Sequence, residues 1–234
     1  MPLQRRHFTL ALATLPLGCA IPALPPLQSE RASAPAQPPA RRAAAVGQQW
    51  TYRRYNGFNS ELLATEEHEV TQADDTVRVR LRRTDGMALG DEMQTQDGAM
   101  LVDRAWDLPQ AYDPALPFWP GLAPADAKLN TDGHYRVEGE SFRYWYVQRR
   151  RVVGWETISV PAGRMTALRV EQYMKLQHRD FSRIETTRHD TIWWVPGIGR
   201  WGAREVWGEY LIPDDHGPYR GLEAHHRWEL TAWR

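Results

Sequence analysis

Residues 76–82 read Thr-Val-Arg-Val-Arg-Leu-Arg (TVRVRLR), and this stretch decides the fold class. Apolar and charged side chains alternate in it without exception, with one phase formed by Val77, Val79 and Leu81 and the other by Arg78, Arg80 and Arg82. Because successive side chains of a β-strand point to opposite faces, the stretch predicts a strand with one buried face and one charged face in water.

Similar alternation continues on both sides, and turn-forming residues separate the stretches. The strand-like stretches are residues 50–55, 87–96, 142–155, 155–160, 165–176, 184–195, 201–211 and 225–233. The turn signals are Asn56-Gly57, Asp85-Gly86, Asp97-Gly98, Pro161-Ala162-Gly163 and Pro196 to Gly199. The proline-rich residues 106–130 predict a long connection with one short helix around 124–129, and Phe118 and Trp119 are expected to tuck under the sheet. The sequence therefore predicts an all-β fold: one curved antiparallel sheet or half-open barrel, with at most one or two short helices.

The composition is that of a globular chain. The 234 residues are 42% hydrophobic and 25% charged, which suits one good-sized domain or two small ones. Collagen and coiled coils are excluded. The 29 basic residues are balanced by 29 acidic ones, so we expect no nucleic-acid partner bound through bulk charge. All 11 Trp follow residue 45, and such rings favour half-buried β-surfaces.

Residues 1–19 have the three parts of a secretory signal peptide. Arg5 and Arg6 supply the positive charge, an apolar run follows from Phe8 to Leu17, and small residues surround Cys19. The run is about ten residues, roughly half of the ~20 needed to span a bilayer as a helix. Arg5, Arg6 and Phe8 also resemble a twin-arginine export signal, and an ordinary Sec signal is the alternative.

The end of this segment resembles a bacterial lipobox, in which Cys19 becomes the lipidated first residue. The run Leu15-Pro16-Leu17-Gly18-Cys19 departs from the usual pattern at Pro16, where Leu is typical. A plain signal cut after Ala20 or Ala23 is the alternative. Several acyl chains give stable anchoring, so the lipobox predicts a membrane partner and a place on the periplasmic face of the cell envelope. The resemblance to bacterial lipoproteins further implies anchoring to the outer membrane, because Ala20 and not Asp follows the Cys. The alternative is a soluble periplasmic protein.

Residues 20–45 are rich in Pro and Ala and are expected to form a tether. Pro favours extended polyproline-like segments, and 26 such residues at ~3 Å each would hold a domain up to ~80 Å from a membrane. A stretch of no selected length is the alternative. Residues 46–234 would then form the antiparallel β domain.

Two stretches resemble a known family. The first is Gly154 to Gly163 (GWETISVPAG), and the second is Ile192 to Arg200 (IWWVPGIGR). With a Gly-x-x-Trp-x-Tyr opening at Gly47, they resemble uncharacterised secreted proteins and lipoproteins of proteobacteria, which share a Trp-Glu-x-Val-x-Val-Pro-Ala-Gly hairpin. This chain departs at Trp194, where that family has Tyr. The resemblance covers roughly residues 47–234. It implies a curved sheet broadly similar to periplasmic lipoprotein-carrier half-barrels, and no enzyme activity.

The sequence gives no pattern for a catalytic site, so no catalytic residue is predicted. A Gly-x-Ser-x-Gly elbow, a phosphate loop and a His-Glu-x-x-His motif are all missing. Carboxylates in apolar strands are expected to pair with arginines across strands, and these are Glu156, Glu171, Glu205 and Glu209 with Arg169, Arg200 or Arg204. The cluster from Asp214 to His216, with His225 and His226, suits a turn better than a metal site. We therefore expect neither a metal nor another cofactor.

The binding candidates are tryptophans. A set near the end of the chain is predicted to line a ligand cleft on the concave face: Trp193, Trp194, Trp201 and Trp207. The alternative is that they form the core of the sheet. Two-residue alternation places Trp193 and Trp194 on opposite faces, and Trp201 and Trp207 on the same face. The sequence thus favours a non-enzymatic envelope lipoprotein that binds an apolar ligand or an envelope protein. The alternatives are a hydrolase acting on envelope polymers and a purely structural assembly factor.

Overall fold

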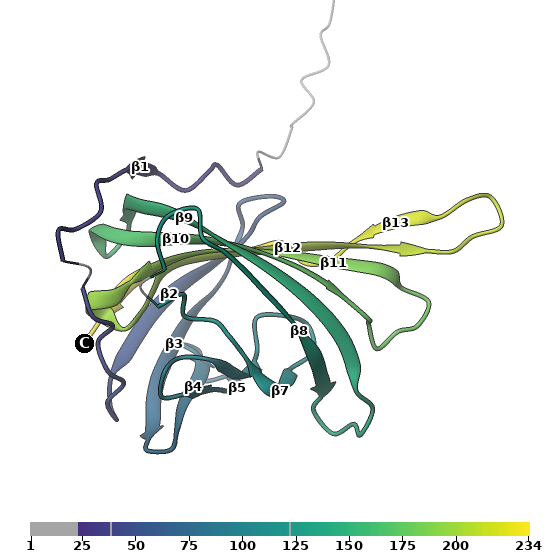
Figure 1. Ribbon diagram of the computed structural model, residues 1–234, viewed down its shortest axis with the longest axis horizontal. Coiled ribbons are helices and arrows are strands. Elements are labelled where there is room, and N and C mark those ends of the chain that lie inside the picture. Colours follow the sequence, from purple (N-terminus) through teal and green to yellow (C-terminus); the bar gives the residue numbers. More distant parts are fainter. Residues whose placement is uncertain (1–22, 38, 122) are drawn as a thin grey trace, which may run out of the picture.

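The computed structural model describes residues 23–37, 39–121 and 123–234, and these residues form an all-β structure (Figure 1). Its strands are β1 (Ser29–Arg31), β2 (Gln49–Asn56), β3 (Leu62–Ala73), β4 (Thr76–Arg83), β5 (Ala88–Thr95), β6 (Met100–Asp103), β7 (Gln110–Leu116), β8 (Lys128–Val137), β9 (Tyr144–Val160), β10 (Gly163–Leu176), β11 (Ile184–Val195), β12 (Arg200–Ile212), β13 (Tyr219–Leu222) and β14 (His226–Trp233). In this part of the chain the only helix is one 3-10 turn, η1 (Pro196–Ile198).

All strand pairs are antiparallel, and the sheet closes into a barrel. The order runs β9-β10-β11-β12-β14-β2-β3-β4-β5-β6-β7-β8, and β8 then pairs with β9 again. This closing contact uses the first half of β9, Tyr144 to Arg151, while its second half pairs with β1. The predicted all-β class is confirmed, and the ring is complete rather than half-open.

The predicted strands are present, with three differences. The two predicted stretches 142–155 and 155–160 form the single long strand β9, which carries a bulge at Val153. The predicted connection 106–130 contains β7 and the start of β8. The short helix expected around 124–129 is wrong, because Ala127 closes a turn onto Pro124 and β8 begins at Lys128.

The turn between β9 and β10 is the predicted Pro-Ala-Gly corner. Val160 pairs with Gly163, so Pro161 and Ala162 form a two-residue loop. Gly163 has φ +117°, a conformation that a residue with a Cβ rarely adopts. This explains the glycine at the end of the motif.

The barrel interior is apolar in part and charged in part. In β4, Val77, Val79 and Leu81 are buried, as predicted, and Arg82 on the outer face pairs with Glu67 of β3 at 2.7 Å. Buried apolar side chains fill one portion of the interior and include Tyr52, Val70, Met100, Tyr146, Ile192 and Leu230. Phe118 is buried as predicted and packs edge-on against Trp194. Buried charged side chains fill the rest, and they define the candidate site below.

The described part of the predicted tether lies against the barrel. We call residues 24–37 and 39–45 the N-terminal strap. Leu24 N–H donates to the carbonyl of Gly57, β1 pairs with β9, and Arg42 N–H donates to the carbonyl of Pro196. Figure 1 shows this strap running beside β9 from the β2–β3 turn to the opposite end of the barrel.

The strap also explains a second glycine. Gly199 has φ +71°, and a Cβ there would lie 2.6 Å from the carbonyl oxygen of Arg42. Only glycine therefore allows the strap to approach the β11–β12 turn this closely.

The predicted export and lipidation residues lie outside the described residues: Arg5, Arg6, Phe8 and Cys19. Among the described residues, no helix is long and apolar enough to cross a membrane.

Candidate functional site

Two of the four predicted cleft tryptophans lie inside the barrel. Trp194 is 1% exposed and packs against Phe118 and Trp119, with ring centroids 5.1 Å apart in both pairs. Trp201 is 2% exposed and packs against Tyr52 with ring centroids 4.0 Å apart. Trp194 and Trp201 are register partners in neighbouring strands, so they belong to the same interior face.

The other two lie on the outer wall, so the four residues do not line one cleft. Trp193 donates from Nε1 to Glu156 at 2.9 Å and lies under the guanidinium of Arg169. Trp207 is 38% exposed and stacks on His189. Trp193 and Trp194 thus face opposite ways, as predicted.

The prediction that Trp201 and Trp207 share a face is wrong. Trp193 pairs with Ala203 while Trp194 pairs with Trp201, so β12 has one extra residue, Gly202, at this point. A bulge of this kind shifts the alternation by one residue. Trp201 therefore turns inward although Trp207 points out.

The predicted pairing of strand carboxylates with arginines is confirmed, with different partners in part. Glu156 pairs with Arg169 at 3.3 Å, and Glu171 pairs with both Arg169 and Arg151. Glu205 and Glu209 pair instead with Arg227 and Arg220. Ion pairs thus connect neighbouring strands on the outer wall. Arg200 and Arg204 point inward instead and pair with Glu92 and Asp190.

A cavity of about 210 Å³ lies inside the barrel at the end where β2 ends and β14 begins. Its lining combines indole rings with charged and imidazole groups, among them Trp106, Trp201, Trp228, Glu66, His68 and Glu92. It shares Arg54 and residues 104–107 with a second space of about 320 Å³, which reaches His226. We call this end, formed by the β2–β3 turn, the β6–β7 and β10–β11 loops and β13, the open end.

Glu66 is an acid in the cavity wall that is held by three neighbouring side chains. One carboxylate oxygen, Oε2, accepts from Trp228 Nε1 at 2.9 Å and lies 3.3 Å from His68 Nε2, and Arg54 lies 3.1 Å from the other oxygen. Burial would raise the pKa of Glu66, but His68, Arg54 and Trp228 outweigh it and hold this pKa below its usual range. Glu66 therefore stays ionised, with Oε2 hydrogen-bonded and Oε1 held by the ion pair with Arg54 alone.

His68 is held in one tautomer. Its Nδ1 accepts from Arg200 Nη2 at 3.0 Å, because a guanidinium can only donate, so the proton sits on Nε2 and points to Glu66. Burial lowers the pKa of His68, with Arg200 adding to the effect against Glu66. Arg200 also binds both oxygens of Glu92, at 2.9 and 3.0 Å, and Arg200 and Glu92 are each 3% exposed.

A second ion cluster lies deeper in the barrel. Arg204 binds Asp190 at 2.6 Å and Asp103 at 3.0 Å, and all three side chains are buried. Burial raises the pKa of Asp190 to about 6, against the pull of Arg204. Such groups are costly to bury and are stable here only because each finds a partner.

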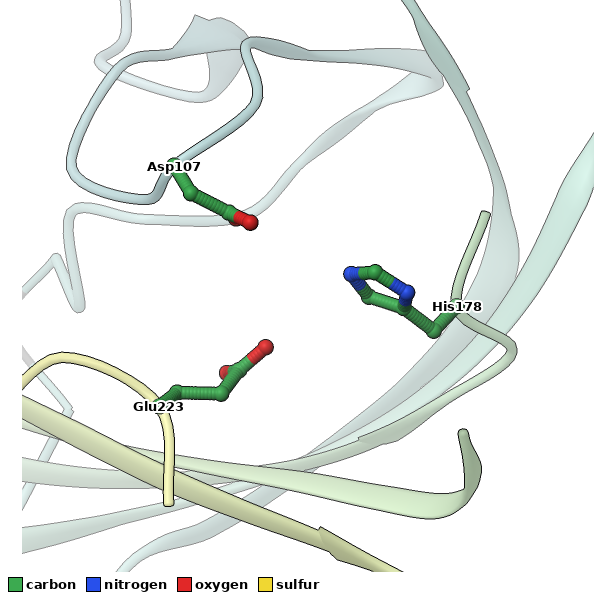
Figure 2. A group of neighbouring side chains, drawn as sticks. All are labelled: Asp107, His178 and Glu223. Carbon is green, nitrogen blue, oxygen red and sulfur yellow. The ribbon is translucent and has the colours of Figure 1, made fainter. Parts of the chain in front are cut away.

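Loops close over the open end and bring three further residues together. Asp107 comes from the β6–β7 loop, His178 from the β10–β11 loop and Glu223 from the residue after β13, and Figure 2 shows the three side chains converging. One ligand atom of each lies within 4.8 Å of the others. Arg188 binds both oxygens of Glu223, at 2.6 and 2.9 Å, and stacks on Trp106.

This trio has the residue types of a metal site, but its hydrogen bonds do not fit a metal. His178 Nδ1 accepts from the backbone N–H of Asp180 at 3.0 Å, so the neutral ring carries its proton on Nε2, the atom that faces the carboxylates. Both oxygens of Glu223 already bind Arg188. Burial, together with Arg183 and Arg188, lowers the pKa of His178. A metal ion at this place would be repelled by Arg183 and Arg188. It would also meet the N–H of His178 Nε2, where a ligand must offer a lone pair.

His178 Nε2 is instead a buried donor with no partner among the described residues, and Trp201 Nε1 and Arg54 Nε share that property. Buried donors of this kind bind ordered water or a ligand. The open end is therefore a polar cavity with aromatic walls and unused hydrogen-bond donors.

The sequence reasoning missed the charged residues of the interior. Glu66 and His68 occur in phase with Val70 in β3, and Arg204 in phase with Val206 in β12. A charge in the buried phase of a strand was therefore visible in the sequence and indicates an interior ion pair. Asp107, His178 and Glu223 lie in loops, where no periodicity marks them. The cluster Asp214 to His216 is exposed at the β12–β13 hairpin tip, and His225 bonds Glu205 instead.

Comparisons with known proteins support the fold. No family model matches the chain, and no curated protein matches it. Solved structures with a similar fold include a protein provisionally described as exported, with a YmcC-like fold, from Bacteroides fragilis NCTC 9343. Its TM-score is 0.50 at 14% identity, covering 84% of this chain and 99% of that one. Another is provisionally described as a lipoprotein, from Parabacteroides distasonis ATCC 8503, with TM-score 0.50 at 13% identity, covering 81% and 96%. At these identities the likeness shows the fold alone, and the resemblance to a proteobacterial family stays a prediction.

Proposed function

We propose that the protein is a non-enzymatic lipoprotein of the bacterial cell envelope that binds a small polar ligand at the open end of its barrel. The observation that carries the binding function is the pair of adjoining spaces, about 210 and 320 Å³, lined by indole rings and by donors without partners. Pockets that combine apolar walls with a few placed polar groups are typical of ligand sites.

The lining favours a polar ligand over the apolar one that the sequence suggested. Arg54, Glu66 and Glu92 line the inner space, and an acyl chain placed against them would leave charges without solvent or partner. The inner volume corresponds to roughly seven water molecules at about 30 Å³ each. One saccharide-sized ring with hydroxyl or amide acceptors suits this space.

A binding role is favoured over hydrolysis because the buried acids and bases are bound to one another. General acid–base catalysis needs a group that can exchange a proton with substrate. Glu66 is occupied by Trp228, His68 and Arg54, and both oxygens of Glu92 are occupied by Arg200. Neither of these two buried acids is therefore free for the proton transfer that the alternative, a hydrolase acting on envelope polymers, would need.

The envelope location rests on the signal-like residues 1–19 and on Cys19, and the exported and lipoprotein descriptions of the similar structures support it. We expect the full chain to partition into the detergent phase of a detergent extraction and to carry a lipid label. Cys19→Ala should abolish both. A wild-type chain found in the aqueous phase would favour the soluble periplasmic alternative.

The binding proposal is tested by titrating the full chain with N-acetylglucosamine and, separately, with palmitate, while intrinsic tryptophan fluorescence is followed. Trp201→Phe removes the unpartnered Nε1 donor but keeps a ring in place. We expect it to weaken saccharide binding about fivefold, the value of one hydrogen bond of about 1 kcal/mol.

Trp194→Phe is the matched control, because Trp194 Nε1 is also buried and unpartnered but does not line the cavity. Palmitate binding with no saccharide response would instead support the apolar ligand that the sequence suggested. Equal losses in both variants would show that the effect comes from packing and not from the cavity.

A further inference from the structure

A row of side chains crosses the outer wall of the barrel over five neighbouring strands, away from the open-end cavity. The strand register places Asn130 of β8 beside Arg149 of β9, then Tyr173 of β10, His189 of β11 and Trp207 of β12. These strands lie side by side in Figure 1. The row is therefore set by backbone pairing and does not depend on flexible loops.

The last three members of the row form a continuous aromatic surface. Tyr173 meets His189 edge-on with ring centroids 5.2 Å apart, and His189 stacks on Trp207 at 3.9 Å with an interplanar angle of 2°. Tyr173 and Trp207 remain 37% and 38% exposed. Large rings that stay exposed next to one another on a soluble surface mark an interaction site more often than isolated ones.

Cations line the same place. A groove of about 520 Å³ runs along this wall, and Lys128, Arg149 and Arg151 contribute to it with the three rings. Arg151 pairs with Glu171 at 2.8 Å, whereas Lys128 and Arg149 have no ion-pair partner among the described residues. The groove thus has an excess of positive charge beside flat apolar rings.

We propose that this groove binds an anionic polysaccharide, a chain of pyranose rings that carry carboxylate groups. The apolar faces of the sugar rings stack on Trp207 and Tyr173, because such rings offer a large flat contact at low entropic cost. The carboxylates pair with Arg149 and Lys128, since a guanidinium binds a carboxylate through two hydrogen bonds.

The acidic side chains in and beside the groove favour a polymer over a lipid surface. Glu171 lies inside the groove, and Glu209 follows two residues after Trp207 on the same face of β12, so acidic side chains interrupt the cationic surface that an anionic membrane would need. A chain of sugars can place its acids between these positions.

The test is electrophoresis of the full chain in native gels that contain polygalacturonate, with dextran as the neutral polymer and phosphatidylglycerol–phosphatidylcholine vesicles as the lipid arm. We expect retardation by polygalacturonate that weakens as salt is raised, and little by dextran. Trp207→Ala should weaken the interaction about tenfold, the contribution of one stacked ring. Arg149→Ala should reduce its salt dependence.

The matched control is Trp233→Ala, because Trp233 is 42% exposed and does not line the groove. Absence of retardation, or equal losses for Trp207→Ala and Trp233→Ala, would overturn the proposal. Vesicle binding that Trp207→Ala abolishes, without polygalacturonate binding, would assign the groove to a lipid surface instead. Trp201→Phe should leave the retardation unchanged, so this proposal and the open-end cavity fail separately.

Discussion

Replacing Arg204 by Met should destabilise the protein strongly, because it leaves acids buried without their cation. Arg204 is the only cation bound to Asp190 and Asp103 among the described residues, at 2.6 and 3.0 Å. Met keeps an unbranched apolar side chain like the stem of Arg and removes the guanidinium. Breaking a buried ion pair from one side costs about 3–5 kcal/mol. Since domains are stable by only about 5–15 kcal/mol, this is a large fraction of the total.

The destabilisation should depend on pH in a defined direction. Burial raises the pKa of Asp190 to about 6, above the ~3.9 of an unfolded chain. A group whose pKa is raised on folding contributes stability below its unfolded pKa, and that contribution is lost as pH rises through the folded value. Arg204 is what lowers this pKa, so the variant should have a still higher one. Its penalty should therefore be smaller at pH 5 than at pH 8, by about 1.4 kcal/mol for each further pKa unit.

The assay is urea unfolding of both proteins at pH 5 and pH 8, with free energies from linear extrapolation. Arg204→Met combined with Asp103→Asn and Asp190→Asn should recover more than half of the loss, because no charge then remains buried in this cluster. The control is Arg82→Met, which breaks the half-exposed pair with Glu67 and should cost no more than about 1 kcal/mol. A loss that is equal at the two pH values, or no larger than that of Arg82→Met, would refute the reasoning.

Three other predictions concern the turn, the strap and the loop cluster. Gly163→Ala should cost about 1–3 kcal/mol in urea unfolding because φ is +117° there, while Gly197→Ala, where a Cβ meets nothing within 4 Å, should be close to neutral. Arg41→Ala should cost about 1–2 kcal/mol and speed amide exchange in the strap, since it removes hydrogen bonds to Gln94 and Gly199. Zinc should not raise the melting midpoint, and nitrogen NMR should find the proton of His178 on Nε2; a saturable rise that His178→Gln removes would contradict this.

The strands could be predicted from the sequence because one physical signal determines them. Alternation in β4 placed Val77 inside and Arg82 outside, and the Pro-Ala-Gly corner fixed the β9–β10 hairpin. Both depend only on neighbours in the chain. Closure of the ring does not, because β8 meets β9 through a register that joins Lys128 to Arg151 and follows from the curvature of the whole sheet.

The candidate site was less predictable, because it too depends on contacts between residues that are distant in the chain. The Trp201 ring faces inward because of a single extra residue, Gly202, and strict alternation placed it on the wrong face relative to Trp207. A bulge leaves little trace beyond the glycine itself. The interior charged residues were visible in the buried phase of β3 and β12, but their partners come from strands far away in sequence, such as Glu92 for Arg200.

The docked strap shortens the distance at which a lipid on Cys19 would hold the barrel from a membrane. As a free tether, residues 20–45 would hold the barrel up to ~80 Å from a membrane. Leu24 is instead hydrogen-bonded to Gly57, which leaves five residue steps from Cys19, or about 18 Å when fully extended. Gly57 follows β2 at the open end and lies next to His225. His225 in turn is hydrogen-bonded to Glu205, which precedes Trp207 by two residues in β12. An anchor at Cys19 would therefore hold both the open-end cavity and the β12 side of the outer groove near the bilayer surface, where ligands attached to envelope components are within reach.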